Sequence, residues 1–94
     1  MSQSAVQLTP LALRMLQALA QEQQARAGQS VPLVRLAKRL EAAASRVLRE
    51  LAMINLLLAQ AQQAPWVETQ SVDGRWMLAW TAPGAAAASQ IAQA

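Results

Sequence analysis

Two neighbouring segments of this chain alternate aliphatic and basic residues at the spacing of an α-helix. Residues 33–40 read LVRLAKRL, and residues 45–51, only a few positions later, read SRVLREL. Five of the eight basic residues lie between positions 35 and 49. Each segment therefore predicts a short helix with one apolar face and one basic face. Two such helices joined by a tight turn must bury their apolar faces on a shared core.

A longer helix is predicted before this pair. Thr9 can cap it, and Pro10 suits its first position, where the missing N–H costs nothing. Aliphatic residues then recur every three or four positions, so the helix should run to about Ala25. In the link that follows, Ser30 can cap the next helix. Val31 can instead pair as a one-residue strand against a later hairpin.

The two amphipathic helices have well-defined inner faces. The turn between them falls at Glu41 and Ala42, and the second helix starts near Ala43 or Ala44. Nothing stops that helix before Gln62. The inner residues are Leu33, Leu36, Ala37 and Leu40 in the first helix, and Val47, Leu51, Ile54 and Leu58 in the second.

After Pro65 the pattern becomes alternating, which predicts a β-hairpin. Residues 66–72 and 75–81 form its strands, and Asp73-Gly74 forms a two-residue turn. This turn pairs Val72 with Arg75, Ser71 with Trp76, Thr69 with Leu78, and Val67 with Trp80. We therefore expect Trp76 and Trp80 to pack on the core, beside Val67 and Leu78.

An alanine-rich terminal helix is predicted over residues 82–92, with Thr81 as its cap and Ile91 as its only large apolar anchor. The chain of 94 residues suffices for one small domain. The predicted fold class is mainly α with a small β-hairpin (α+β), in the order helix, helix, helix, hairpin, helix.

This order of elements resembles the winged helix-turn-helix family, above all the small MarR-like DNA-binding regulators, over residues 9–92. The resemblance is carried by residues 36–40 and 45–51 in the two motif helices and by residues 66–68, 73–75 and 78–84 around the hairpin. It implies a single winged helix-turn-helix domain over 1–94, with the helix-turn-helix at 32–58, the wing at 66–81 and the terminal helix at 82–92. The sequence departs from the family at Glu41, where glycine is common, and at residues 42–44, which lack a Ser or Thr cap.

The resemblance implies sequence-specific binding of double-stranded DNA by a transcriptional regulator, with residues 43–57 as the recognition helix in the major groove. The base contacts that it implies are Ser45, Arg46, Arg49 and Ala44. The phosphate contacts that it implies are Arg35, Lys38, Arg39 and Arg75. The basic faces can also be read as solvated helix surfaces, and Arg75 as a hairpin residue that balances Asp73.

The segment from Met53 to Leu58 is apolar on more than one face of its helix and needs a second cover. We therefore expect a homodimer, whose interface candidates are Met53, Leu56, Leu57 and Ile91. The same exposed run favours an alternative function, a winged-helix module for protein–protein contact or assembly without a DNA role.

Several function classes find no support in the composition. The chain has no His, no Cys, one Asp and four Glu that do not cluster, so we expect neither an enzyme nor a metal or cofactor site. With Phe and Tyr absent and the wing tryptophans expected in the core, a platform that stacks single-stranded bases is not expected. No secretion signal or membrane span is recognisable, which predicts a cytoplasmic protein without a membrane partner. No effector pocket for a small molecule is indicated.

Overall fold

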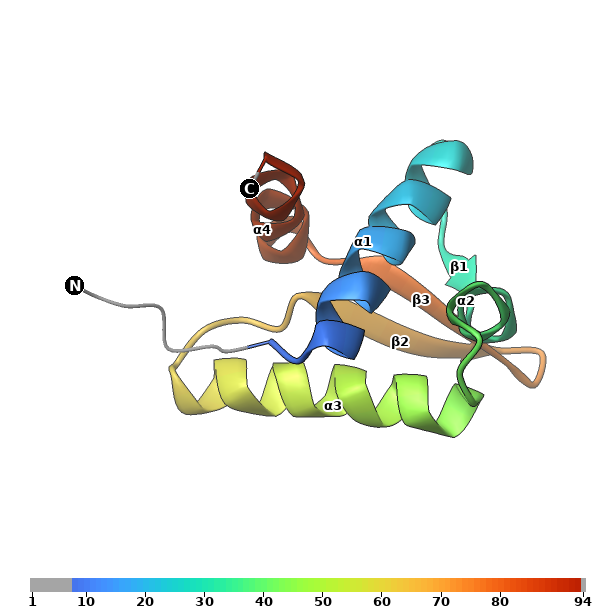
Figure 1. Ribbon diagram of the computed structural model, residues 1–94, viewed down its shortest axis with the longest axis horizontal. Coiled ribbons are helices and arrows are strands. Elements are labelled where there is room, and N and C mark those ends of the chain that lie inside the picture. Colours follow the sequence, from blue (N-terminus) through green and yellow to red (C-terminus); the bar gives the residue numbers. More distant parts are fainter. Residues whose placement is uncertain (1–7, 94) are drawn as a thin grey trace.

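The computed structural model describes residues 8–93, with side chains described as far as Gln90. The structure is mostly helical with one three-stranded antiparallel sheet, as the fold-class prediction stated (Figure 1). Its elements are α1 (Pro10–Ala25), β1 (Val31–Pro32), α2 (Leu33–Leu40), α3 (Ala44–Gln60), β2 (Val67–Val72), β3 (Arg75–Trp80) and α4 (Ala82–Gln93).

Helix α1 packs against α2, α3 and α4, and so forms the centre of the helical layer. It begins where the sequence predicts, because the Thr9 hydroxyl accepts a hydrogen bond from the Ala12 N–H at 3.0 Å. The eight predicted inner residues of α2 and α3 are at most 6% exposed, which confirms both apolar faces. From α1, the core receives Ala12, Met15, Leu16, Ala18 and Leu19.

Three helices are followed, within two residues of their last residue, by a residue in the left-handed conformation that is not glycine. These residues are Ala27, Glu41 and Gln62, with φ of 57°, 54° and 59°. After α3, Gln63 N–H donates to the Leu58 carbonyl at 2.8 Å, and Gln62 N–H donates to Ala59 at 3.0 Å. This pair of bonds is a Schellman motif. It ends α3 at Gln60, two residues before the predicted end at Gln62.

The sheet has the order β1-β3-β2 and confirms the predicted hairpin register at every pair, from Val67 opposite Trp80 to Val72 opposite Arg75. Of the two interpretations of the link before α2, the strand is the one found, since Val31 pairs with Leu78. The Ser30 cap is wrong, because the strand runs directly into the helix and Pro32 occupies the N-cap position.

The prediction that Trp76 packs on the core is also wrong. Trp76 is 46% exposed, whereas Val67 and Leu78 on the same face are buried and Trp80 is partly buried. The reason is position along the strand, since Trp76 lies next to the turn and beyond the part of the sheet that the helices cover. In Figure 1 the turn between β2 and β3 projects at the same end of the molecule as α2 and the start of α3.

Helix α4 begins at a compact junction. Thr81 caps it as predicted, accepting a hydrogen bond from the Gly84 N–H at 3.0 Å, and the Thr81 N–H donates to the Trp66 carbonyl at 2.9 Å. The side chain of Ile91, an expected interface residue, lies outside the described residues. Over the described part of the chain, no helix has the length and apolar character needed to cross a membrane.

Candidate nucleic-acid interface

The first half of α3 presents a polar, cationic outer face. Val47 and Leu51 bury the inner side of the helix, which leaves Ser45, Arg46 and Arg49 exposed. Within residues 8–90, neither arginine forms an ion pair. Both guanidinium groups are therefore available to a ligand that approaches this face.

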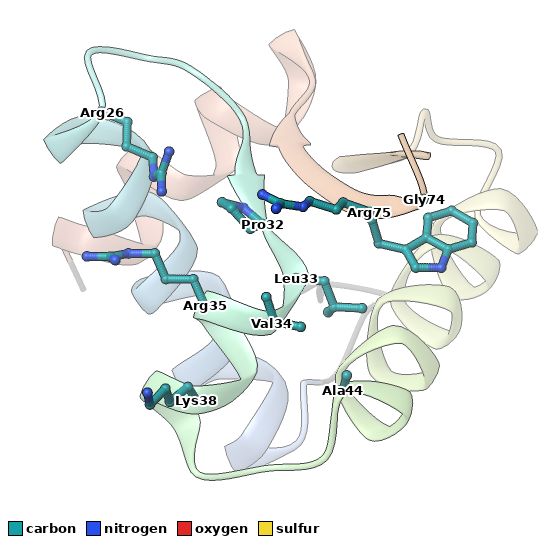
Figure 2. A pocket seen from close by; sticks show the side chains of 10 residues that line it. Arg26, Pro32, Leu33, Val34, Arg35, Lys38, Ala44, Gly74 and Arg75 are labelled. Carbon is teal, nitrogen blue, oxygen red and sulfur yellow. The ribbon is translucent and has the colours of Figure 1, made fainter. Parts of the chain in front are cut away.

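A cleft of about 800 Å³ lies beside the start of α3, and we call it the wing cleft. Its walls come from the residue after α1, the strand β1, the helices α2 and α3, and the wing. The lining residues are Arg26, Pro32, Leu33, Val34, Arg35, Lys38, Ala44, Gly74, Arg75 and Trp76. Four of these side chains are cationic and none is acidic. Figure 2 shows the long side chain of Arg75 reaching back over Pro32 towards Arg26. Such a concentration of positive charge favours a polyanionic ligand.

One carboxylate organises part of the α2 basic face. Glu22 of α1 is buried, and its oxygens accept hydrogen bonds from Arg35 Nε at 2.6 Å and from Arg39 Nη1 at 2.8 Å. These two bonds lower the pKa of Glu22 below its ordinary value. Arg39 also donates to the Gln21 side chain and does not line the wing cleft. Three of the four residues expected at phosphates, Arg35, Lys38 and Arg75, thus line the wing cleft. Arg39 does not line it, but lies with Arg35, Lys38 and Glu22 around a neighbouring hollow.

A second hollow of about 680 Å³ lies on the other side of the start of α3, between α1 and the turn after α2, and we call it the turn cleft. Arg14 and Arg46 line it together with Glu41 and Glu50. Glu50 also accepts a hydrogen bond from the Thr9 hydroxyl at 3.1 Å. The charges of the turn cleft therefore balance, whereas the wing cleft keeps an excess of positive charge even though Arg35 is paired with Glu22.

Sequence reasoning did not assign six of the residues that line the wing cleft to a site, and Arg26, Val34 and Trp76 are the three of these that bear charge or exposed apolar surface. Val34 is 69% exposed at the start of α2, although it is aliphatic. The signal that could have revealed Trp76 is its place directly after the turn dipeptide and Arg75. No comparable signal marked Arg26, because its approach to α2 depends on how α1 crosses the other helices.

Farther along α3, the outer face becomes apolar. Met53 and Leu56 are 50% and 51% exposed, and Leu57 is partly buried. These residues were expected at a dimer interface, and their exposure leaves them accessible to a partner. In the described part of the chain, no cluster of acidic residues is arranged to hold a metal ion.

Comparison with known proteins gives a clear result for the fold. No protein-family model and no curated protein sequence matches this chain. Among solved structures, a cysteine-to-serine mutant of MarR from E. coli matches with a TM-score of 0.63 and 22% identity, over 92% of this chain and 56% of that one. ZitR, a zinc-responsive MarR family member from Lactococcus lactis, matches with a TM-score of 0.63 and 18% identity, over 97% of this chain and 56% of that one.

A third solved structure is of similar size. It is a candidate DNA-binding protein from Ralstonia eutropha, which matches with a TM-score of 0.63 and 26% identity, over 90% of this chain and 98% of that one. The chain thus spans about half the length of MarR and ZitR, and nearly all of the Ralstonia protein. Its fold is a MarR-like winged helix, as the order of elements predicted.

Proposed function

We propose that this protein is a transcriptional regulator that binds double-stranded DNA and reads its sequence with the first half of α3. The observation that carries the proposal is the exposed pair Arg46 and Arg49, next to a cleft lined by four cations. The fold supports DNA binding in general, because the similar structures include MarR, ZitR and a candidate DNA-binding protein. The proposal requires no catalytic group, and access to the chromosome implies a cytoplasmic location.

Each side chain has a distinct role in this proposal. Arg46 and Arg49 read guanine edges with their planar guanidinium groups, Ser45 bonds a base, and the Ala44 methyl group contacts thymine. The phosphates are bound by Arg35, Lys38, Arg39 and Arg75 from the sequence prediction, and by Arg26 from the structure. A homodimer, with Met53, Leu56, Leu57 and Ile91 as interface candidates, would set two α3 helices about one DNA turn apart.

The test compares alanine and lysine variants at the two arginines. Sites selected from a random duplex library by the wild-type protein are measured against unrelated duplexes of equal length. Arg46→Ala and Arg49→Ala should each cost about 1–3 kcal/mol at the selected site and less on unrelated DNA. Arg46→Lys and Arg49→Lys keep the charge and lose the bidentate geometry, so they should lose discrimination but retain general affinity. A wild-type protein that retards no duplex at low salt contradicts the proposal.

The exposed pair Met53 and Leu56 favours a second candidate function, a module that binds another protein and has no DNA role. This module would form salt-insensitive complexes that survive Arg46→Ala and Arg49→Ala. Salt-dependent binding to duplex DNA that is lost in those two variants would exclude it.

A further inference from the structure

The wing cleft combines strong positive charge with exposed apolar surface. Val34 and Trp76 are 69% and 46% exposed, and both line the hollow that Arg26, Arg35, Lys38 and Arg75 surround. The indole and the valine side chain are apolar surface that a ligand seated in the wing cleft would remove from water. A site for simple anions would need only the charges.

One ligand carries both features in alternation. A DNA strand presents a phosphate and then a deoxyribose at every nucleotide, so a cleft that follows it gains from cations and from apolar surface at adjacent points. Ala44, the first residue of α3, also lines this cleft. A DNA duplex that held α3 in its groove would therefore have one bordering backbone beside the wing cleft.

We propose that the wing cleft holds the sugar–phosphate backbone of one DNA strand, with Trp76 and Val34 packed against deoxyribose and the four cations on the flanking phosphates. This inference rests on the proposed function and adds to it an apolar positioning contact from the wing. Trp76 fixes how the duplex lies against α3 and reads no base. Figure 2 shows the two sides of the wing cleft, with Arg35 and Lys38 on α2 and Arg75 on the wing.

The same hairpin offers a matched control. Val72 is 44% exposed on β2 but does not line the wing cleft. It borders a different hollow, with Ser30, Asp73, Arg75 and Met77. Val72→Ala therefore removes exposed apolar surface from the wing without changing any residue that lines the wing cleft.

The experiment measures binding of a fluorescent duplex at several salt concentrations by Trp76→Ala, Trp76→Phe, Val72→Ala and Arg75→Ala. Trp76→Ala should weaken binding about five- to tenfold. Its salt dependence should equal that of the wild-type protein, because a sugar contact releases no counterion. Trp76→Phe should recover part of the affinity, and Val72→Ala should bind like wild type. Arg75→Ala should flatten the slope of log K against log salt by about 0.9.

A second measurement does not depend on a variant that binds weakly. The difference in fluorescence between wild type and Trp76→Phe isolates the Trp76 signal. Acrylamide should quench that signal in the free protein, and saturating duplex should shield it.

Three results would overturn the inference while leaving the proposed function intact. The first is wild-type affinity for duplex in Trp76→Ala, and the second is a Trp76 fluorescence signal that duplex does not shield. The third is a larger loss of affinity in Trp76→Ala for single-stranded DNA than for duplex, which would indicate base stacking. Failure of the proposed function itself looks different, because the wild-type protein then binds no duplex at all.

Discussion

At the scale of single residues, Glu22 is the group that the sequence explained least well. Its spacing after Leu19 places it on the inner side of α1, among aliphatic residues. The buried carboxylate of Glu22 is stabilised by ion pairs with Arg35 and Arg39 of α2, which contact it only in the folded chain. A contact between residues this far apart in sequence has no periodic signature. The exposure of Trp76 was mispredicted for a related reason. The alternating pattern shows which face of the sheet Trp76 lies on, but not how much of that face the helices cover.

The ion pairs of Glu22 predict a pH dependence. Their hydrogen bonds lower the pKa of the folded carboxyl below its ordinary 4.5. The ionised group therefore contributes stability above about pH 4.5, and this contribution disappears as pH falls through the lowered pKa. Thermal melts should show wild type more stable than Glu22→Gln at pH 6, with the gap closing towards pH 3. Glu68→Gln, at an exposed position of β2, is the control, and a gap that does not change with pH would contradict the assignment.

At the scale of elements, the helix ends were harder to predict than the helices. The inner faces of α2 and α3 follow from spacing alone, and the Asp73-Gly74 turn leaves one hairpin register that puts Val67 and Leu78 inside. Helix α3, in contrast, ends at Gln60, and Gln62 just after it adopts a conformation that sequence would assign to glycine. Because Gln62 is exposed and its Schellman bonds are backbone bonds, no side-chain pattern reveals this end.

Gln62→Gly should therefore stabilise the protein. Glycine adopts a positive φ without the strain of a Cβ atom, and the expected gain is about 1 kcal/mol in the free energy of unfolding. Urea denaturation followed by circular dichroism measures it. Gln63→Gly, one position later and with no positive φ, is the matched control and should not stabilise. An unchanged or lower midpoint for Gln62→Gly would contradict this account of the helix end.

Gly84→Ala should have the opposite effect at the start of α4. A Cβ atom there would lie 1.9 Å from the Trp66 carbonyl oxygen, so α4 or the segment before β2 must shift. We expect a loss of about 1–3 kcal/mol, the range for overpacked sites. Ala85→Ser, an exposed change at the next residue, should stay within about 0.5 kcal/mol of wild type. Equal denaturation midpoints for Gly84→Ala and wild type would show that this junction is looser than described.

At the scale of the whole molecule, the net charge of +3 conceals a strong asymmetry. Four cations line the wing cleft and one of them, Arg35, is paired with Glu22, whereas the turn cleft has two arginines and two glutamates. The sequence predicted the basic faces of α2 and α3, since their spacing is local. It could not predict that Arg26 joins the wing cleft or that Glu22 bonds both Arg35 and Arg39, because both depend on how α1 crosses α2.

The proposed homodimer is also a property of the whole molecule. Leu56→Glu places a charge on the exposed apolar part of α3 and should shift the protein to a monomer in sedimentation velocity. Binding to a duplex with two half-sites should weaken, and binding to a single half-site should not. Gln60→Glu, an exposed change one turn later on α3, adds the same charge outside the interface candidates. A Leu56→Glu protein that sediments like wild type would exclude this surface as the interface.

Arg46 and Arg49, which form no ion pair within residues 8–90, are proposed to read the sequence of duplex DNA from the outer face of α3. The most direct measurement is selection from a random duplex library with wild type and with the double variant Arg46→Ala, Arg49→Ala. We expect wild type to enrich one shared motif and the double variant to enrich none, although it still binds duplex at low salt through the wing cleft. Enrichment of the same motif by both proteins would contradict the claim.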